Sequence, residues 1–203
     1  LIIKELDKSA KYNDFINNIE NKKSPISLSG LTGVAEAGIV SSVMERTKRP
    51  IMLITYNEIQ AQNLVNDLKF FTDDVIYLPK KEIVTYDYVA ESKNLPYERI
   101  EVLNKIYKKQ KNIIVTSIET IKQKMISKNA LYKNVLNFKV GDRFILEDVK
   151  QKLINLGYER FDLIDGRGEF SVRGGIVDIS TTDNTGIRIE LWGDEIDSIR
   201  HFN

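Results

Sequence analysis

The fold is decided by a stretch near the start of the sequence, which reads Leu28-Ser29-Gly30-Leu31-Thr32-Gly33-Val34-Ala35-Glu36-Ala37. The segment before it, Pro25 to Leu28, reads as a short strand, and the segment after it has the apolar spacing of a helix. A strand, a glycine-containing turn and a helix follow one another in this order at a phosphate-binding loop. The same order is equally compatible with an ordinary tight turn between a strand and a helix.

The stretch resembles a phosphate loop in the order of its elements, but it lacks the residues that bind phosphate and magnesium. Such a loop needs a lysine for the β and γ phosphates and a hydroxyl for magnesium. Counted from Gly30, the lysine position holds Glu36 and the hydroxyl position holds Ala37. Ala35 replaces the glycine before the lysine, and Gly33 completes the turn. At ~4 Å and an effective dielectric of 20, a carboxylate repels a phosphate charge by about 4 kcal/mol, against ~1 kcal/mol from the helix dipole. We therefore expect a degenerate phosphate loop, no catalytic residues, no ATP hydrolysis and no cofactor.

Around this loop, the first half of the chain alternates short apolar runs with helical segments, which predicts βα units on a parallel sheet. Asn57 is a predicted N-cap, Pro96 suits the first turn of another helix, and Ser117 is expected to cap a short helix that ends near Met125. The segment 80–95 is expected to be a connecting loop. The predicted strands are 25–28, 51–55, 75–78 and 112–116, and the predicted helices include 34–47 and 57–71.

After about Ser127 the pattern changes to one helix followed by closely spaced extended segments. The helix 146–156 is expected to end at Gly157, where a left-handed residue closes it. Turns rich in glycine and aspartate separate the extended segments, which predicts an antiparallel meander with the helix packed on it. The fold class is therefore α/β, with a parallel-sheet domain over 1–127 and an α+β antiparallel domain over 128–203. The predicted extended segments are 158–164, 169–173, 176–179, 186–192 and 195–202.

Composition excludes several classes of protein. The 203 residues are 42% hydrophobic and 29% charged, which is typical of a globular chain rather than a disordered one. With 30 Lys and Arg against 29 Asp and Glu, the net charge of +1 gives no general attraction for nucleic acid. The absence of cysteine and the single histidine, His201, exclude disulfides, thiolate or multi-histidine metal sites and a histidine dyad. No apolar run reaches the ~20 residues of a membrane span, and we expect a cytoplasmic protein.

Four strings in order along the chain resemble one known family. They are Thr85-Tyr86-Asp87-Tyr88 and the segments 157–162, 168–179 and 193–199. Together they resemble the amino-terminal part of the nucleotide-excision-repair protein UvrB. Two features of UvrB are absent: the working phosphate loop, and a long aromatic hairpin, because the chain passes through Ala90-Glu91-Ser92 directly to Pro96. Both absences are shared with the amino-terminal UvrB-homology module of the transcription-repair-coupling factor family (Mfd), which the chain resembles from about Ser27 to Asn203.

The resemblance implies an architecture and a set of partners. It implies a degenerate helicase-like α/β domain over 1–127, similar to domain 1a of UvrB, and an inserted domain over 128–203, similar to UvrB domain 2, that docks on UvrA. It further implies a protein-interaction module that brings excision repair to a stalled RNA polymerase. RNA polymerase and duplex DNA would be partners of a longer, ATP-dependent translocase through parts outside this chain. No membrane partner is implied.

The resemblance also assigns residues to UvrA binding. Arg160 and Arg173 match arginines that contact UvrA in UvrB-like proteins, and Ser171 stands where UvrB has a further arginine. Arg167 in the preceding turn could supply part of that missing charge. Phe170 and Ser171 are also expected in the UvrA-binding set, although period-two alternation places Phe170 on the opposite face of the strand from Ser171 and Arg173. An alternative interpretation from the residues alone is that these arginines solvate the sheet and pair with neighbouring acids.

Other features support an alternative function or an ordinary structural role. A lysine cluster favours an ATP-independent DNA-binding module as the second hypothesis, although cations also stabilise the end of a helix. Tyr86 and Tyr88 are expected to pack on the core, with base stacking as the alternative. The acidic string 194–197 is expected to be a turn between strands, and Trp192 is expected to pack in the core or at a sheet edge. The lysines are Lys105, Lys108, Lys109 and Lys111.

Overall fold

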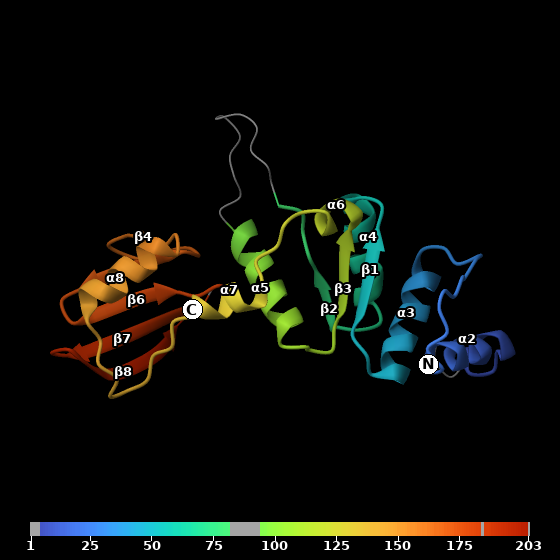
Figure 1. Ribbon diagram of the computed structural model, residues 1–203, viewed down its shortest axis with the longest axis horizontal. Helices are drawn as coiled ribbons and strands as arrows, with labels where there is room; N and C mark the ends of the chain where they lie inside the picture. Colours follow the sequence, from blue (N-terminus) through green and yellow to red (C-terminus); the bar gives the residue numbers. More distant parts are fainter. Residues whose placement is uncertain (1–4, 82–93, 184, 203) are drawn as a thin grey trace, which may run out of the picture. The chain divides into compact units, whose positions relative to one another are not determined.

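The structure is a computed structural model that describes residues 5–81, 94–183 and 185–202. The chain divides into two compact units, and each contains one β-sheet (Figure 1). The first unit combines 1–80 with 108–124, and the second combines 81–107 with 125–203. The expected domain boundary at residue 127 stays a prediction.

The first unit contains a parallel sheet of three strands. Its order is β1 (Ile51–Thr55), β3 (Ile113–Ser117) and β2 (Val75–Tyr77), so the strand that comes last in the sequence lies in the centre (Figure 1). β3 is buried along its whole length, as expected for a central strand with both faces covered. These three strands were predicted to within one residue, and the parallel α/β character of this unit is confirmed.

Helices α3 (Val34–Thr47) and α4 (Glu58–Lys69) share a core with this sheet. The unit also contains α2 (Ala10–Glu20) and α6 (Ile118–Ile121). Leu68 of α4 and Val115 of β3 are fully buried in one cluster. The predicted N-caps are confirmed, because the side chain of Asn57 accepts from the amide of Gln60 and that of Ser117 accepts from the amide of Thr120. Helix α2 was not predicted from the sequence.

The predicted strand at Pro25 to Leu28 is wrong. These residues form neither helix nor strand, and Leu28 is 48% exposed. A strand is stable when a neighbour takes its backbone hydrogen bonds and one of its faces is buried. Pro25 has no N–H to donate, and most side chains of this segment are exposed. The glycine turn therefore follows an irregular segment rather than a strand of the sheet.

The second unit contains a sheet of five strands in sequence order. The strands are β4 (Glu159–Arg160), β5 (Glu169–Arg173), β6 (Ile176–Ser180), β7 (Gly186–Trp192) and β8 (Glu195–Phe202). Helix α8 (Leu146–Asn155) lies along one face of this sheet (Figure 1), where its Leu153 packs with Phe170 in the core. Gly157 follows α8 with φ +87°, as predicted. The helices α5 (Leu95–Tyr107) and α7 (Lys128–Lys133) complete the unit.

The first strand of this sheet corrects the predicted antiparallel meander. β5 to β8 pair antiparallel as expected, but β4 is only two residues long and pairs parallel with β5. One of the expected turns rich in glycine and aspartate, at Asp165-Gly166, does not join two hairpin strands. Instead the carboxylate of Glu169 accepts from the amides of Asp165 (2.7 Å) and Gly166 (3.0 Å), so the connection folds on itself. The pairing shows that β5 runs in the same direction as β4.

The position of Trp192 is a second correction. This side chain lies at the end of β7 and is 85% exposed, whereas the sequence predicted packing in the core or at an edge. Its strand ends at the turn through Gly193, so no neighbouring element covers the ring. The acidic string that follows does form the predicted turn and strand, with Ile196 buried in the core. None of the helices in the described part of the chain is long and apolar enough to cross a membrane.

Candidate functional site

The degenerate phosphate loop leads directly into helix α3. Gly33, with φ +55°, occupies the N-cap position and provides no side-chain hydrogen bond to the helix. Glu36 lies in the first turn and is exposed, as is Ala35. Ala37 is fully buried in the core of the unit, so the position of the magnesium-binding hydroxyl is occupied by a methyl group that packs inward. Gly30, with φ +82°, begins the turn.

The carboxyl ends of the parallel strands, where such sheets usually bind ligands, contain a second carboxylate. Glu58, the first residue of α4, accepts from the amide of Lys80 at 3.1 Å and from the hydroxyl of Thr120 at 3.0 Å. The hydroxyl of Tyr77 also donates to Glu58. The ammonium group of Lys80 pairs with Glu119 instead. Glu58 therefore keeps its negative charge among uncharged donors.

The protonation of Glu58 follows from these contacts. Burial raises the pKa of the carboxyl, but the hydrogen bonds from Ser117, Tyr77, Thr120 and the amide of Lys80 outweigh it and lower the pKa overall. Burial and the nearby carboxylate raise the pKa of Tyr77. The sequence gives no sign of this cluster, because a glutamate directly after an N-cap is typical of the favourable charge in the first turn of a helix.

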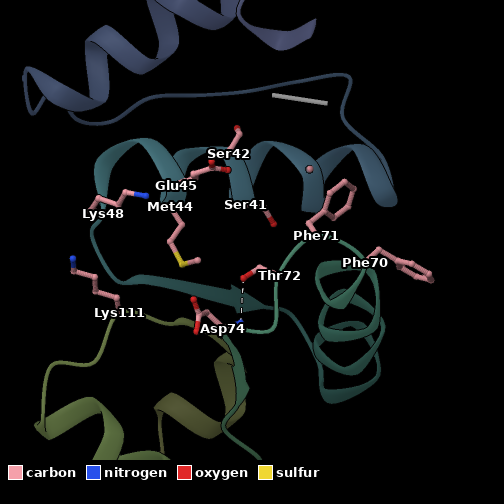
Figure 2. Close-up of a pocket in the computed structure, with 11 residues that line it drawn as sticks. Ser41, Ser42, Met44, Glu45, Lys48, Phe70, Phe71, Thr72, Asp74 and Lys111 are labelled. Carbon is pink, nitrogen blue, oxygen red and sulfur yellow. Dashed lines mark hydrogen bonds between the residues drawn. The ribbon is translucent and has the colours of Figure 1, made fainter. Parts of the chain in front are cut away.

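A cavity of about 860 Å³ lies at the opposite edge of the same sheet. Asp74 precedes β2 and Lys111 precedes β3, so the cavity is at the amino ends of the strands. Figure 2 shows the hydroxyl of Ser41 and the side chain of Met44 directed into it from α3. The rim carries two lysines and two carboxylates, and these balanced charges favour no class of ligand. The charged residues are Glu45, Lys48, Asp74 and Lys111.

In the second unit, Arg160 lies at an open sheet edge. It is exposed on β4, and no carboxylate in the described part of the chain forms an ion pair with it. The next apolar residues are also accessible, with Phe161 40% and Leu163 68% exposed. The register pairs Arg160 with Phe170, whose side chain faces the core and α8. Arg160 therefore emerges on the α8 side of the sheet.

Arg173 emerges on the opposite side of the sheet and has a buried partner. Its guanidinium donates to Asp178 at 3.0 Å, and its own side chain is 47% exposed against 3% for Asp178. Arg188 holds the same carboxylate through two hydrogen bonds, of 2.7 and 2.9 Å. The pKa of Asp178 is lowered, mainly by the hydrogen bonds from Arg188 and further by the one from Arg173. Sequence spacing gave no sign of this three-strand cluster.

Arg167 is less accessible than the other two arginines. Its side chain is 15% exposed and approaches Glu98 of α5 at 4.0 Å, while one of its terminal nitrogens is buried without a hydrogen bond to the described residues. The adjacent Gly168 has φ +77° and lies against the hydroxyl of Tyr97. Helix α5 thus supports the loop that leads into β5, and Arg167 belongs to this packed contact.

The remaining two predicted residues are buried. Phe170 is fully covered in the core, and Ser171 is 1% exposed although it lies on the opposite face, beside Asp178. The alternation predicted for β5 is therefore correct for Phe170 and Arg173, but the face that carries Ser171 is not open to solvent there. Neither side chain can contact a partner directly, and each can act only by supporting β5.

The residues behind the alternative hypothesis have ordinary environments. Lys105 pairs with Glu101 one turn earlier in α5, at 2.7 Å. Lys108, Lys109 and Lys111 are exposed, which leaves DNA binding by them a prediction. Tyr86 and Tyr88 lie outside the described residues.

Comparison with known proteins gives consistent similarities over the chain. Residues 136–203 match the family described as UvrB interaction domain. The chain is 32% identical to the transcription-repair-coupling factor of Bacillus subtilis (strain 168), over 99% of this chain and 17% of that protein. It is 32% identical to the transcription-repair-coupling factor of Staphylococcus aureus (strain bovine RF122 / ET3-1), over 87% of this chain and 15% of that protein. The chain is 31% identical to the transcription-repair-coupling factor of Staphylococcus epidermidis, over 88% of this chain and 15% of that protein. The chain thus spans less than a fifth of the length of these relatives.

Proposed function

The chain belongs to the transcription-repair-coupling factor family, and from this premise we propose that it is a non-catalytic module that recruits UvrA and so couples nucleotide excision repair to a stalled RNA polymerase. The observation that carries the proposal is the match of 136–203 to the UvrB interaction domain, in the unit that presents Arg160 and Arg173. In a longer protein, RNA polymerase and duplex DNA would bind through other parts.

The surroundings of the two arginines support a protein partner. Arginine is enriched at interfaces because its planar guanidinium can bind a carboxylate through two parallel hydrogen bonds. Arg160 is followed by two exposed apolar side chains, Phe161 and Leu163, which a partner surface could cover. Arg173 is held in place by a buried acid, so little side-chain freedom would be lost on binding. Arg167, Phe170 and Ser171 would act by supporting the loop and strand that carry these two residues.

The first unit supports a module without nucleotide chemistry. Glu36 occupies the position of the phosphate-binding lysine, and Glu58 adds an ionised carboxylate at the carboxyl ends of the strands. Both charges repel a triphosphate. We expect calorimetric titration with magnesium and ATP to give no binding heat. A measurable affinity would contradict this part of the proposal.

The proposal is tested by measuring UvrA binding to the parent chain and to Arg160→Ala, Arg173→Ala and the double variant. Each single change should weaken binding by ~1–3 kcal/mol, the range of interface hot spots, and the double variant should lose most of the affinity. Arg49→Ala, which changes an exposed arginine of the first unit, is the matched control and should bind as the parent does. Equal capture of UvrA by the double variant and the parent would contradict the assignment. Salt-dependent binding to duplex DNA without UvrA would favour the alternative module.

A further inference from the structure

The face of the second sheet opposite α8 carries a row of polar residues on four neighbouring strands. The register places Ser171 of β5 beside Asp178 of β6, Asp178 beside Arg188 of β7, and Arg188 beside Arg200 of β8. Asp178 is buried at the centre of this row, whereas Arg200 at its end pairs with Glu190. The row therefore places the buried acid between a buried serine and Arg188, and the side chains of Arg188 and Arg200 reach solvent.

The buried acid organises two of these arginines. Asp178 accepts three hydrogen bonds, two from Arg188 and one from Arg173, and both of its oxygens are used. Arg188 is fixed further by the ring of Phe202, 5.6 Å from the guanidinium carbon to the ring centre. The side chains of Arg173 and Arg188 nevertheless remain 47% and 38% exposed. One carboxylate thus holds two guanidinium groups side by side at the surface.

These two guanidinium groups have N–H donors that Asp178 does not use. Each guanidinium has five N–H donors, and Asp178 takes only three bonds from the two together. The cluster of one carboxylate and two arginines has a local charge of +1, which suits a further carboxylate. It suits an extended polyanion poorly, because Glu190 lies beside Arg200 on the same face and Glu169 lies on the same side of β5. The chemistry therefore favours an acidic side chain of a protein over a nucleic-acid backbone.

We propose that Arg188 is a further partner-contacting residue, and that Asp178 is a positioning residue that holds Arg173 and Arg188 as a pair for one carboxylate of an acidic protein surface. This inference rests on the proposed function, because the acidic surface is taken to be that of UvrA. It adds a residue from β7, and it explains how a binding surface can persist where a serine replaces the additional arginine of β5. Ser171 is too short to reach solvent, and its hydroxyl is buried without a hydrogen bond to the described residues.

The test measures UvrA affinity for the whole chain and its variants. Arg188→Ala and Arg188→Lys should each weaken binding by about 10-fold, a typical loss at a hot spot, because lysine keeps the charge but loses the planar fork. Arg200→Ala removes a more exposed arginine from the same row and should bind as the parent does. Asp178→Asn should also weaken binding. In an Arg173→Ala/Arg188→Ala background, however, Asp178→Asn should have no further effect on affinity, which a general loss of structure would not reproduce.

The outcomes separate this inference from the proposed function. If Arg160→Ala weakens binding but Arg188→Ala and the parent bind UvrA equally, the arginine pair is wrong and the UvrA assignment stands. If the parent chain does not bind UvrA, both are wrong. Loss of duplex DNA binding by Arg188→Ala with unchanged UvrA binding would overturn the inference in favour of a phosphate site. An additional loss from Asp178→Asn in the double-arginine background would overturn the positioning role.

Discussion

Each unit contains a carboxylate that its neighbours keep ionised. The neighbours are uncharged donors around Glu58 and guanidinium groups around Asp178. Glu58 of the first unit accepts from hydroxyls and a backbone amide, all uncharged, so its cluster stays negative. Asp178 of the second unit accepts from two guanidinium groups, so its cluster is positive. Hydrogen bonds lower the pKa of both acids, yet the first surface repels an anion and the second attracts one.

This difference shows that the identity of a buried acid does not decide what its surface binds. The donors around the acid decide the net charge that a partner meets. In the first unit the donors come from the end of β2, from the segment after it and from α6, whose N-cap is the hydroxyl of Ser117. In the second unit they come from neighbouring strands, whose long side chains extend to solvent.

The largest effect is expected for Gly168→Ala, which would disrupt the contact between α5 and the loop before β5. A Cβ at this position would lie 1.7 Å from the hydroxyl oxygen of Tyr97, and the backbone has φ +77°. Strain of about 1–2 kcal/mol from the positive φ and ~1–3 kcal/mol from the overlap should together lower the free energy of unfolding by roughly 2–5 kcal/mol. Urea unfolding of the whole chain measures this change.

Gly166→Ala is the matched control for this experiment. It lies two residues away, its φ is not in the left-handed region, and a Cβ there would meet the carboxylate of Glu169 at 3.4 Å, which a side chain can accommodate. We expect a change within ~0.5 kcal/mol, as for most surface substitutions. Equal destabilisation by the two alanines would show that the contact between α5 and the loop before β5 has no special role.

An intermediate effect is expected when each acid is replaced by its amide. At pH 7, Asp178→Asn should lower the free energy of unfolding by about 2 kcal/mol, since its hydrogen bonds come from charged groups, and Glu58→Gln by about 1 kcal/mol. The folded pKa of both acids is lowered. Each acid therefore stabilises the fold fully above its unfolded pKa of about 4, and the contribution is lost as the pH falls through the folded value.

Urea unfolding measured between pH 7 and pH 3 tests this dependence. The difference between the parent and each amide variant should be constant from pH 7 to about pH 5 and should shrink below about pH 4. A difference that grows toward low pH would mean that the folded pKa is raised and that the hydrogen-bond account of these acids is wrong.

The smallest effect is expected for Trp192→Ser. The side chain is 85% exposed, so its replacement should change the free energy of unfolding by less than ~0.5 kcal/mol. A tryptophan packed in the core, as the sequence suggested, would cost about 3–5 kcal/mol on truncation. The same urea unfolding experiment separates these two values, and a loss near the larger one would contradict the exposed position.

Much of the fold could be read from local patterns in the sequence. Strands β1, β5, β7 and β8 begin and end where the alternation and turns predict. Asn57 and Ser117 cap their helices, and Gly157 closes α8, because capping depends on residues within one turn of each other. Period-two alternation correctly placed Phe170 on the opposite face of β5 from Ser171 and Arg173, but its full burial was not expected of a UvrA-binding residue.

Other features depend on tertiary packing and could not be predicted from local sequence patterns. The parallel pairing of β4, the exposure of Trp192 and the irregular path at Pro25 all depend on which elements become neighbours. The carboxylate clusters of Glu58 and Asp178 each join at least three segments, with partners up to 62 residues apart. Spacing along the chain reports the direction of a side chain from its own helix or strand. Its hydrogen-bond partner comes from another element, and only the packed fold brings the two together.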